Sequence, residues 1–309
     1  MPSSSTSTPH HDPNLLPRHF DVKVNYSLHG GSEQATVHYV SAGSASKPTL
    51  LLLHGFPSSS HQFRNFIPLL ADSYHIFAPD LPGFGLTRVP DHFVYTFESL
   101  TAVTTAFIKT MNLKDMAIYL FDYGAPVGFH IAKNDPGNVK ALITQNGNAY
   151  EDGLGKFWGP LFKLWESNSA ESREVINSKV LTLDGIKGKY CDGVPEEDLP
   201  MIDPATWQLD YYQNIASHKD RQLDLFYDYR NNVKNYPAFH EYFRNSKVPI
   251  LAVWGKNDTS FIPPGAEAFK KDSPSAEVHL VDSGHFPLET KRWEIAAIMK
   301  RWLQLVGFE

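Results

Sequence analysis

Cysteine is almost absent from this 309-residue sequence: Cys191 is the single one. One cysteine cannot form a disulfide within the chain, so nothing here requires an oxidising compartment. Long apolar runs are also missing, since no window approaches the ~18 apolar residues of a membrane span. The first residues, MPSSSTSTPHHDPN, have neither the basic region nor the apolar region of a secretory signal. We therefore expect a cytoplasmic protein without a membrane span.

Positive charge is scarce as well. Lysine and arginine total 28 against 34 aspartates and glutamates, which gives a net charge of −6, and no basic block occurs. This balance argues against nucleic acid or an anionic membrane as a partner and favours a small-molecule substrate. The scattered histidines and the single cysteine form no cluster at zinc spacing, so we expect no metal and no cofactor.

Short apolar runs alternate with amphipathic helical stretches after a Ser/Thr/Pro-rich tail at residues 1–16, which we expect to be disordered. Two alternating segments, 19–27 and 36–42, flank the turn signal Gly30-Gly31 and predict a hairpin. The further predicted strands are 49–53, 75–78, 117–121, 139–143, 249–254 and 278–281, and the predicted helices are 62–72, 96–112, 124–134, 263–271 and 291–305. This order predicts an α/β fold with a mostly parallel sheet flanked by helices.

The alternation of strands and helices is interrupted once. Between about residues 146 and 245 no comparable strand pattern occurs, and the segment is rich in tryptophan and tyrosine. We expect a core formed by residues 17–146 and 246–309, with residues 147–245 forming a helical cap over the sheet.

Candidate catalytic residues follow three of the predicted strands, where parallel sheets place their ligands. Asp122 lies in a strand-to-helix turn, Asp258 follows a later strand in Trp-Gly-Lys-Asn-Asp, and His285 follows the last strand in Ser-Gly-His-Phe. An acid at such a turn, a second acid and a histidine could serve as nucleophile, orienting carboxylate and base. Asp122 could instead be only a helix N-cap, and Glu151 or Asp152 could replace Asp258 as the orienting acid.

The sequence resembles the α/β-hydrolase superfamily, within its epoxide hydrolase and haloalkane dehalogenase branch. The resemblance covers nearly the whole chain and rests on HGFP at 54–57, PDLPGFG at 79–85, LFDYG at 120–124, WGKND at 254–258 and SGHF at 283–286. It implies the α/β-hydrolase fold and, because aspartate replaces serine at the turn, attack on a saturated carbon. Asp122 would form an alkyl ester, and His285, oriented by Asp258, would activate the water that hydrolyses this ester. The resemblance places the oxyanion-binding backbone N–H groups on Phe56 and Tyr123.

Epoxide hydrolases are similar in using cap tyrosines to protonate the departing alkoxide, and Tyr229 in an Asp-Tyr-Arg motif looks like one of them. A second tyrosine is missing from residues 161–166, where the family would have it, and Tyr150, Tyr211 and Tyr212 are the substitutes that the sequence offers. The predicted pocket wall is apolar and aromatic, which suits an apolar substrate. Its residues are Trp165, Phe162, Tyr150 and Phe286.

Haloalkane dehalogenases also resemble the chain, but they carry Asn after His-Gly and Trp after the nucleophile to bind halide. Phe56 and Tyr123 stand at these positions, and Tyr123 also replaces the arginine of the similar fluoroacetate dehalogenases. Tyr229 and Trp165 could still hold a halide through their O–H and N–H groups. We expect epoxide hydrolysis to a vicinal diol, with hydrolytic dehalogenation of a haloalkane or haloacid as the alternative. A non-hydrolytic receptor or a lyase on the same fold, and a homodimer, remain further options.

Overall fold

A computed structural model describes residues 15–309 of the chain. The expected disordered tail at 1–16 therefore lies outside the described residues, apart from Leu15 and Leu16. No helix within the described part of the chain is long and apolar enough to cross a bilayer.

An eight-stranded sheet forms the centre of the molecule, in the order β1-β2-β4-β3-β5-β6-β7-β8. The first two strands form an antiparallel hairpin, β2 also pairs antiparallel with β4, and every other pairing is parallel. The strands are β1 (Arg18–Leu28), β2 (Gly31–Ala42), β3 (Thr49–Leu53), β4 (His75–Pro79), β5 (Met116–Phe121), β6 (Val139–Gln145), β7 (Ile250–Gly255) and β8 (Glu277–Val281). The predicted mostly parallel sheet is thus confirmed.

Alternate residues of the central strands enter two separate cores, one on each face of the sheet. Leu51, Leu53, Ile118 and Leu120 pack into the core that α1 (Phe97–Thr110) and α2 (Gly124–Asn134) cover. Their strand neighbours pack with α9 (Arg292–Leu305) on the opposite face. Because both faces are covered, the central strands consist almost entirely of apolar residues and read as continuous apolar runs.

The predicted helix at 62–72 is wrong. Two short 3₁₀ helices, Ser60–Phe63 and Ile67–Leu69, occupy this stretch instead. Pro68 lies in the middle of the predicted helix and has no N–H to donate, so a continuous α-helix is disfavoured there. The helix predicted at 263–271 also divides, into α8 (Pro264–Ala268) and a 3₁₀ turn, Phe269–Lys271.

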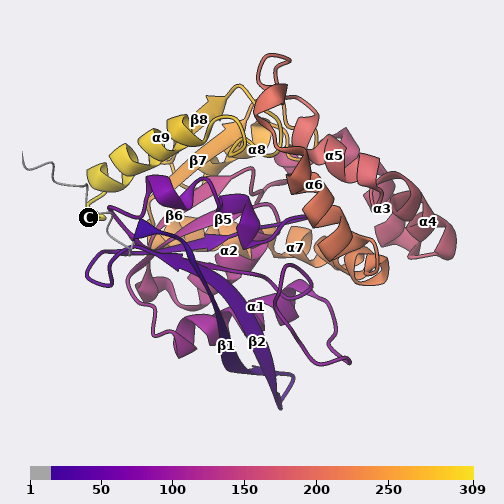
Figure 1. Cartoon of the computed structure of the whole chain (residues 1–309), viewed down its shortest axis with the longest axis horizontal. Helices are drawn as coiled ribbons and strands as arrows, with labels where there is room; N and C mark the ends of the chain where they lie inside the picture. The colour runs from indigo at the N-terminus through magenta and orange to yellow at the C-terminus, as the bar shows by residue number, and fades with distance from the viewer. Residues whose placement is uncertain (1–14) are drawn as a thin grey trace, which may run out of the picture.

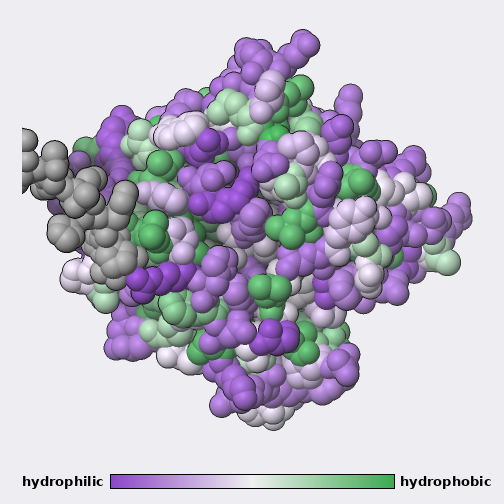
Figure 2. All heavy atoms as spheres, in the orientation of Figure 1, coloured by the Kyte–Doolittle hydropathy of each residue, from purple (hydrophilic) through white to green (hydrophobic). Residues whose placement is uncertain are grey.

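The chain between β6 and β7 is helical and contributes no strand to the sheet of the described chain. Figure 1 shows these helices gathered beside one end of the sheet, with α3 to α6 on the right. They are α3 (Gly159–Ser167), α4 (Ala170–Lys179), α5 (Leu183–Cys191), α6 (Pro204–Asp210) and α7 (Lys219–Ser246). On the face shown in Figure 2, hydrophobic residues are scattered among hydrophilic ones and do not form one continuous patch.

Candidate active site

Asp122 occupies the tight turn between β5 and α2. Its φ angle of 44° lies in the left-handed region, which non-glycine residues seldom adopt and which is often found at functional sites. The turn also depends on two glycines: a Cβ on Gly124 would lie 2.3 Å from the Leu53 carbonyl oxygen, and one on Gly55 would lie 2.5 Å from Asp122 Oδ1. The backbone can therefore pass close enough for the loop after β3 to touch the Asp122 carboxylate.

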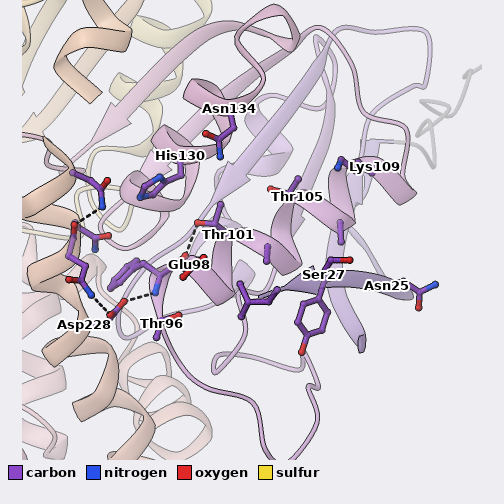
Figure 3. Close-up of a pocket in the computed structure, with 18 of the residues that line it drawn as sticks. Asn25, Ser27, Thr96, Glu98, Thr101, Thr105, Lys109, His130, Asn134 and Asp228 are labelled. Atoms are coloured by element: carbon purple, nitrogen blue, oxygen red, sulfur yellow. Dashed lines mark hydrogen bonds between the residues drawn. The ribbon is translucent and has the colours of Figure 1, made fainter. Parts of the chain in front are cut away.

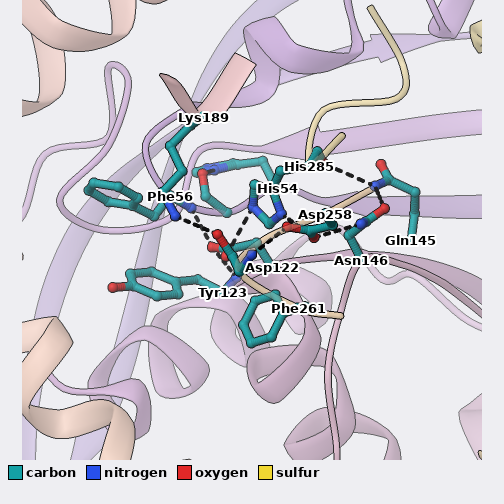
Figure 4. A network of polar contacts seen from close by, with 12 residues as sticks. His54, Phe56, Asp122, Tyr123, Gln145, Asn146, Lys189, Asp258, Phe261 and His285 are labelled. Atoms are coloured by element: carbon teal, nitrogen blue, oxygen red, sulfur yellow. Dashed lines mark hydrogen bonds and ion pairs between the residues drawn. The ribbon is translucent and has the colours of Figure 1, made fainter. Parts of the chain in front are cut away.

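The two carboxylate oxygens of Asp122 have different partners. Oδ1 accepts hydrogen bonds from the backbone N–H of Phe56 at 2.7 Å and of Tyr123 at 2.6 Å. Oδ2 lies 3.4 Å from His285 Nε2, as Figure 4 shows. One oxygen is thus held by two N–H donors, which are the groups that would stabilise an oxyanion, while the other faces the histidine.

His285 lies between the two predicted carboxylates. Its Nδ1 is 2.7 Å from Asp258 Oδ2. Burial alone would lower the pKa of His285, but the charges of Asp258 and Asp122 and the hydrogen bonds to both outweigh burial and raise it. Burial alone would raise the pKa of Asp258, but the His285 charge and the hydrogen bonds that Asp258 accepts lower it.

Asn146 completes this network and was not among the residues singled out in the sequence. It follows β6, has a φ of 47°, and donates through Nδ2 to Asp258 Oδ2 at 2.7 Å. The N–H of Ser260 donates to the other oxygen of Asp258 at 2.7 Å. The alternative orienting acids have other surroundings: Glu151 and Asp152 are exposed, and Asp152 pairs with Lys271. Asn146 could have been found by inspecting the end of every strand.

Tyr229 lies in an aromatic cluster beside Asp122. It is fully buried on α7, and its ring centroid is 4.6 Å from that of Trp158 and 5.9 Å from that of Tyr123. Its hydroxyl makes only a long contact of 3.5 Å, with the hydroxyl of Tyr236. Burial first, and then the charges around it, raise the pKa of Tyr229 well above its usual value, so the hydroxyl keeps its proton.

The residue before this tyrosine holds α7 in place. Asp228 Oδ2 accepts the backbone N–H of Phe97, at the start of α1, at 2.8 Å. Figure 3 shows this contact at the edge of a polar cleft of about 830 Å³ near α1 and α2. Neither Asp122, Asp258 nor His285 lines that cleft. Asp228 therefore supports the position of Tyr229, and the larger cleft is separate from the candidate site.

The predicted pocket residues have different surroundings in the structure. Trp165 stacks near Tyr229, but its indole N–H already donates to the Phe226 carbonyl at 2.8 Å. Phe162 is 40% exposed and packs against Trp165. Trp165 is thus the predicted wall residue that contacts Tyr229.

The other two predicted wall residues pack elsewhere. The Tyr150 hydroxyl donates to Asp272, and its ring stacks on His240. Phe286 lies behind His285, stacked on Tyr190. Of the further tyrosines that the sequence offers, Tyr212 is 66% exposed and packs against Tyr211. None of the contacts described for these aromatic side chains brings a second tyrosine hydroxyl to Asp122.

A second cavity, of about 430 Å³, reaches the site from the side of the helical segment. His285 and Ser260 line its inner end, and Leu161, Gly188 and Lys189 belong to its outer wall. Within residues 15–309, no group of three or more His, Cys, Asp or Glu side chains is arranged to hold a metal ion.

Comparison with known proteins shows what the chain resembles. Residues 48–292 match the family model for the alpha/beta hydrolase fold. An uncharacterized hydrolase of Saccharomyces cerevisiae is 46% identical over 282 residues, which cover 90% of this chain and 94% of that protein. A haloalkane dehalogenase of Mesorhizobium japonicum is 40% identical over 108 residues, 35% of this chain and 34% of that one. The crystal structure of haloalkane dehalogenase DbeA from Bradyrhizobium elkani superposes with a TM-score of 0.73 at 21% identity, covering 94% of this chain and 98% of that one.

Proposed function

We propose that this chain, which belongs to the α/β-hydrolase fold family, hydrolyses a small molecule at a saturated carbon through an alkyl ester on Asp122. One observation carries the proposal. Asp122 Oδ1 is already held by two backbone N–H groups, while Oδ2 faces His285 at 3.4 Å. A carboxylate is a poor nucleophile toward an ester carbonyl, but it can displace a leaving group from an sp³ carbon.

The first step would be attack by Asp122 Oδ2 on the electrophilic carbon of an epoxide. The C–O bond of the epoxide breaks, and the resulting alkoxide takes the proton of the Tyr229 hydroxyl. Tyr229 is suited to this role because its hydroxyl is protonated, buried and engaged only by the long contact with Tyr236. Residues 147–245 would act as a cap, because α7 of this segment supplies Tyr229.

The second step would hydrolyse the ester. His285 Nε2 takes a proton from water, and the hydroxide adds to the carboxyl carbon of Asp122. Negative charge then develops on Oδ1, which the N–H groups of Phe56 and Tyr123 already bind. The Asp258 carboxylate stabilises the imidazolium that forms. Collapse of the adduct releases the diol and restores the Asp122 carboxylate, and the remaining proton returns to Tyr229.

Hydrolytic dehalogenation is the second candidate, and the similarity to the Mesorhizobium japonicum haloalkane dehalogenase supports it. The donors near the site weigh less for it. The indole N–H groups of Trp165 and Trp158 both donate to backbone carbonyls, of Phe226 and Ser260, and are not free to bind a halide. Phe56 offers an apolar side chain at the loop after β3.

Turnover of styrene-type and aliphatic epoxides beside bromo- and fluoro-substrates tests the choice. We expect Tyr229→Phe to slow turnover of an epoxide by about 10²–10⁴-fold, the usual contribution of a general acid. Halide is a good leaving group without protonation, so a halogenated substrate would be turned over at an unchanged rate. Halide release by the wild-type protein with no diol formation from any epoxide would instead identify a dehalogenase.

A further inference from the structure

Lys189 brings a positive charge into the cavity that leads to His285. It lies in the last turn of α5, and Figure 4 shows its side chain extending toward Asp122 and His285. Its Nζ is 2.6 Å from Ser260 Oγ and 3.4 Å from the ring centroid of Phe157. Within residues 15–309, no carboxylate lies within ion-pair distance of this ammonium. Its neighbours are thus a neutral hydroxyl and an aromatic face.

The end of α5 is fastened to both loops that carry the acid and the base. Asn257, next to Asp258, donates through Nδ2 to the Gly193 carbonyl at 2.8 Å. Gly284, next to His285, packs so closely that a Cβ there would lie 2.0 Å from the Asp192 carbonyl oxygen. These contacts fix the position of Lys189 relative to the candidate catalytic residues.

The cavity around Lys189 is otherwise suited to an apolar group. Leu161, Pro160 and Ile176 line it, and two glycines of α5 leave room along the helix. Its other charged residues, apart from His285, are exposed at the rim: Lys156, Lys179, Asp184 and Asp192. Lys189 is therefore the cation placed deepest in this cavity among the described residues.

The charge on Lys189 has a cost that a ligand could offset. Burial lowers the pKa of Lys189 to about 8, against the opposing effect of the Asp258, Asp122 and Asp192 charges, so the ammonium form predominates at pH 7. A buried charge without an ion-pair partner is unfavourable. An anionic substrate would also be repelled by the Asp122 carboxylate unless a cation stood nearby. An ammonium beside a hydroxyl can hold the two oxygens of one carboxylate.

We propose that Lys189, with Ser260, binds a carboxylate carried by the substrate, so that the enzyme prefers an apolar electrophile bearing one carboxylate over its neutral analogue. This inference rests on the proposed function for the turnover measurement, but binding can be measured without turnover. Lys189 would be a specificity-determining residue that acts on substrate choice and leaves the ester chemistry of Asp122 and His285 unchanged.

The turnover experiment compares 3-phenylglycidate with its carboxamide, which has the same shape and no charge. We expect the wild-type protein to favour the carboxylate, and Lys189→Met to lower kcat/KM for it by about 10–100-fold, the usual effect of losing a charged hydrogen bond. Values for the amide would stay within about twofold, since the amide makes no ion pair. Lys187→Met, on the exposed side of the same helix beside Trp207, is the matched control and leaves both substrates unaffected. An equal fall for both substrates, or no fall for the carboxylate, would overturn the proposal.

Calorimetric binding of the unreactive 3-phenylpropanoate and its amide separates this inference from the proposed function. The wild-type protein should bind the carboxylate at least about 10-fold more tightly than the amide, and Lys189→Met should remove that preference while Lys189→Arg keeps most of it. Equal binding of the two ligands by the wild-type protein would refute the carboxylate site, even if epoxides are turned over. A preference for the carboxylate without turnover of any epoxide or halide would support the site and contradict the proposed function.

Discussion

At the scale of single residues, the account depends on how three side chains divide the work. Asp122 is held by backbone donors on one oxygen and faces His285 with the other, and Asp258 fixes the far side of the imidazole. Each of these contacts can be removed while the fold is kept, because each side chain can be replaced by a neutral group of the same size.

His285→Gln should trap the ester. The first step does not need the base, so the variant should react once with an epoxide and then stop. Mass spectrometry of the intact protein should show one added substrate mass, located on the peptide that contains Asp122. Asp122→Asn is the matched control and should show no added mass. An adduct that also forms in Asp122→Asn would place the nucleophile elsewhere.

Activity should fall on the acid side because His285 must be neutral to accept a proton from water. Asp258 and Asp122 raise the pKa of His285, so the acid limb of ester hydrolysis should lie above the usual histidine value. Asp258→Asn removes one of these charges. The limb should then move to lower pH by roughly one unit or more, while the rate at its plateau falls about 10²–10⁴-fold. Single-turnover hydrolysis measured across pH tests this, and an unshifted limb would exclude Asp258 as the partner of His285.

At the scale of elements, the turn between β5 and α2 sets the site through close backbone packing. Gly124 and Gly55 allow β3 and its loop to approach Asp122. In addition, buried Asn214, from the π-helical turn Tyr211–Ile215, donates to the Pro57 carbonyl at 2.8 Å and so ties the helical segment to the loop that carries Phe56.

Gly124→Ala should destabilise the protein by about 1–3 kcal/mol, because the added methyl group would lie 2.3 Å from a backbone oxygen that cannot move freely. Gly137→Ala is the control, since a Cβ there meets nothing within 4 Å. Denaturant unfolding of the two variants tests the difference. Equal stability of both would show that the turn has room for a side chain.

The order and ends of the strands could be predicted because buried parallel strands are nearly continuous apolar runs. That is also why Asp122, Asp258 and His285 could be found: each follows such a run. The 3₁₀ helices near Pro68 show where apolar periodicity alone fails. Lys189 could not be found, because a lysine in a short polar helix is usually exposed, and only the contacts of α5 with two distant loops place it in the cavity.

At the scale of the whole molecule, a buried ion pair joins the sheet to the helical segment. Arg64 binds both oxygens of Glu289, at 3.0 and 2.8 Å, and donates to Thr206 of α6 at 2.9 Å. Glu289 is 3% exposed. The guanidinium thus connects the chain after β3, the chain after β8 and the helices above the site.

Arg64→Met should cost about 3 kcal/mol of stability, because it leaves the Glu289 carboxylate buried without a partner. The double variant Arg64→Met/Glu289→Met should recover most of this loss, since two apolar side chains need no ion pair. Thermal and denaturant unfolding of the two single variants and the double variant would measure the coupling. Additive losses would show that the pair contributes nothing as a pair.

The central claim is that the substrate becomes an ester of Asp122, and a single turnover in oxygen-18 water tests it most directly. Water should add to the carboxyl carbon of Asp122, so the label should appear in the peptide that contains this residue, and the product of the first turnover should carry unlabelled oxygen. The same reaction with His285→Gln should leave that peptide without label from water. Label found directly in the first product, with none in Asp122, would contradict the ester mechanism.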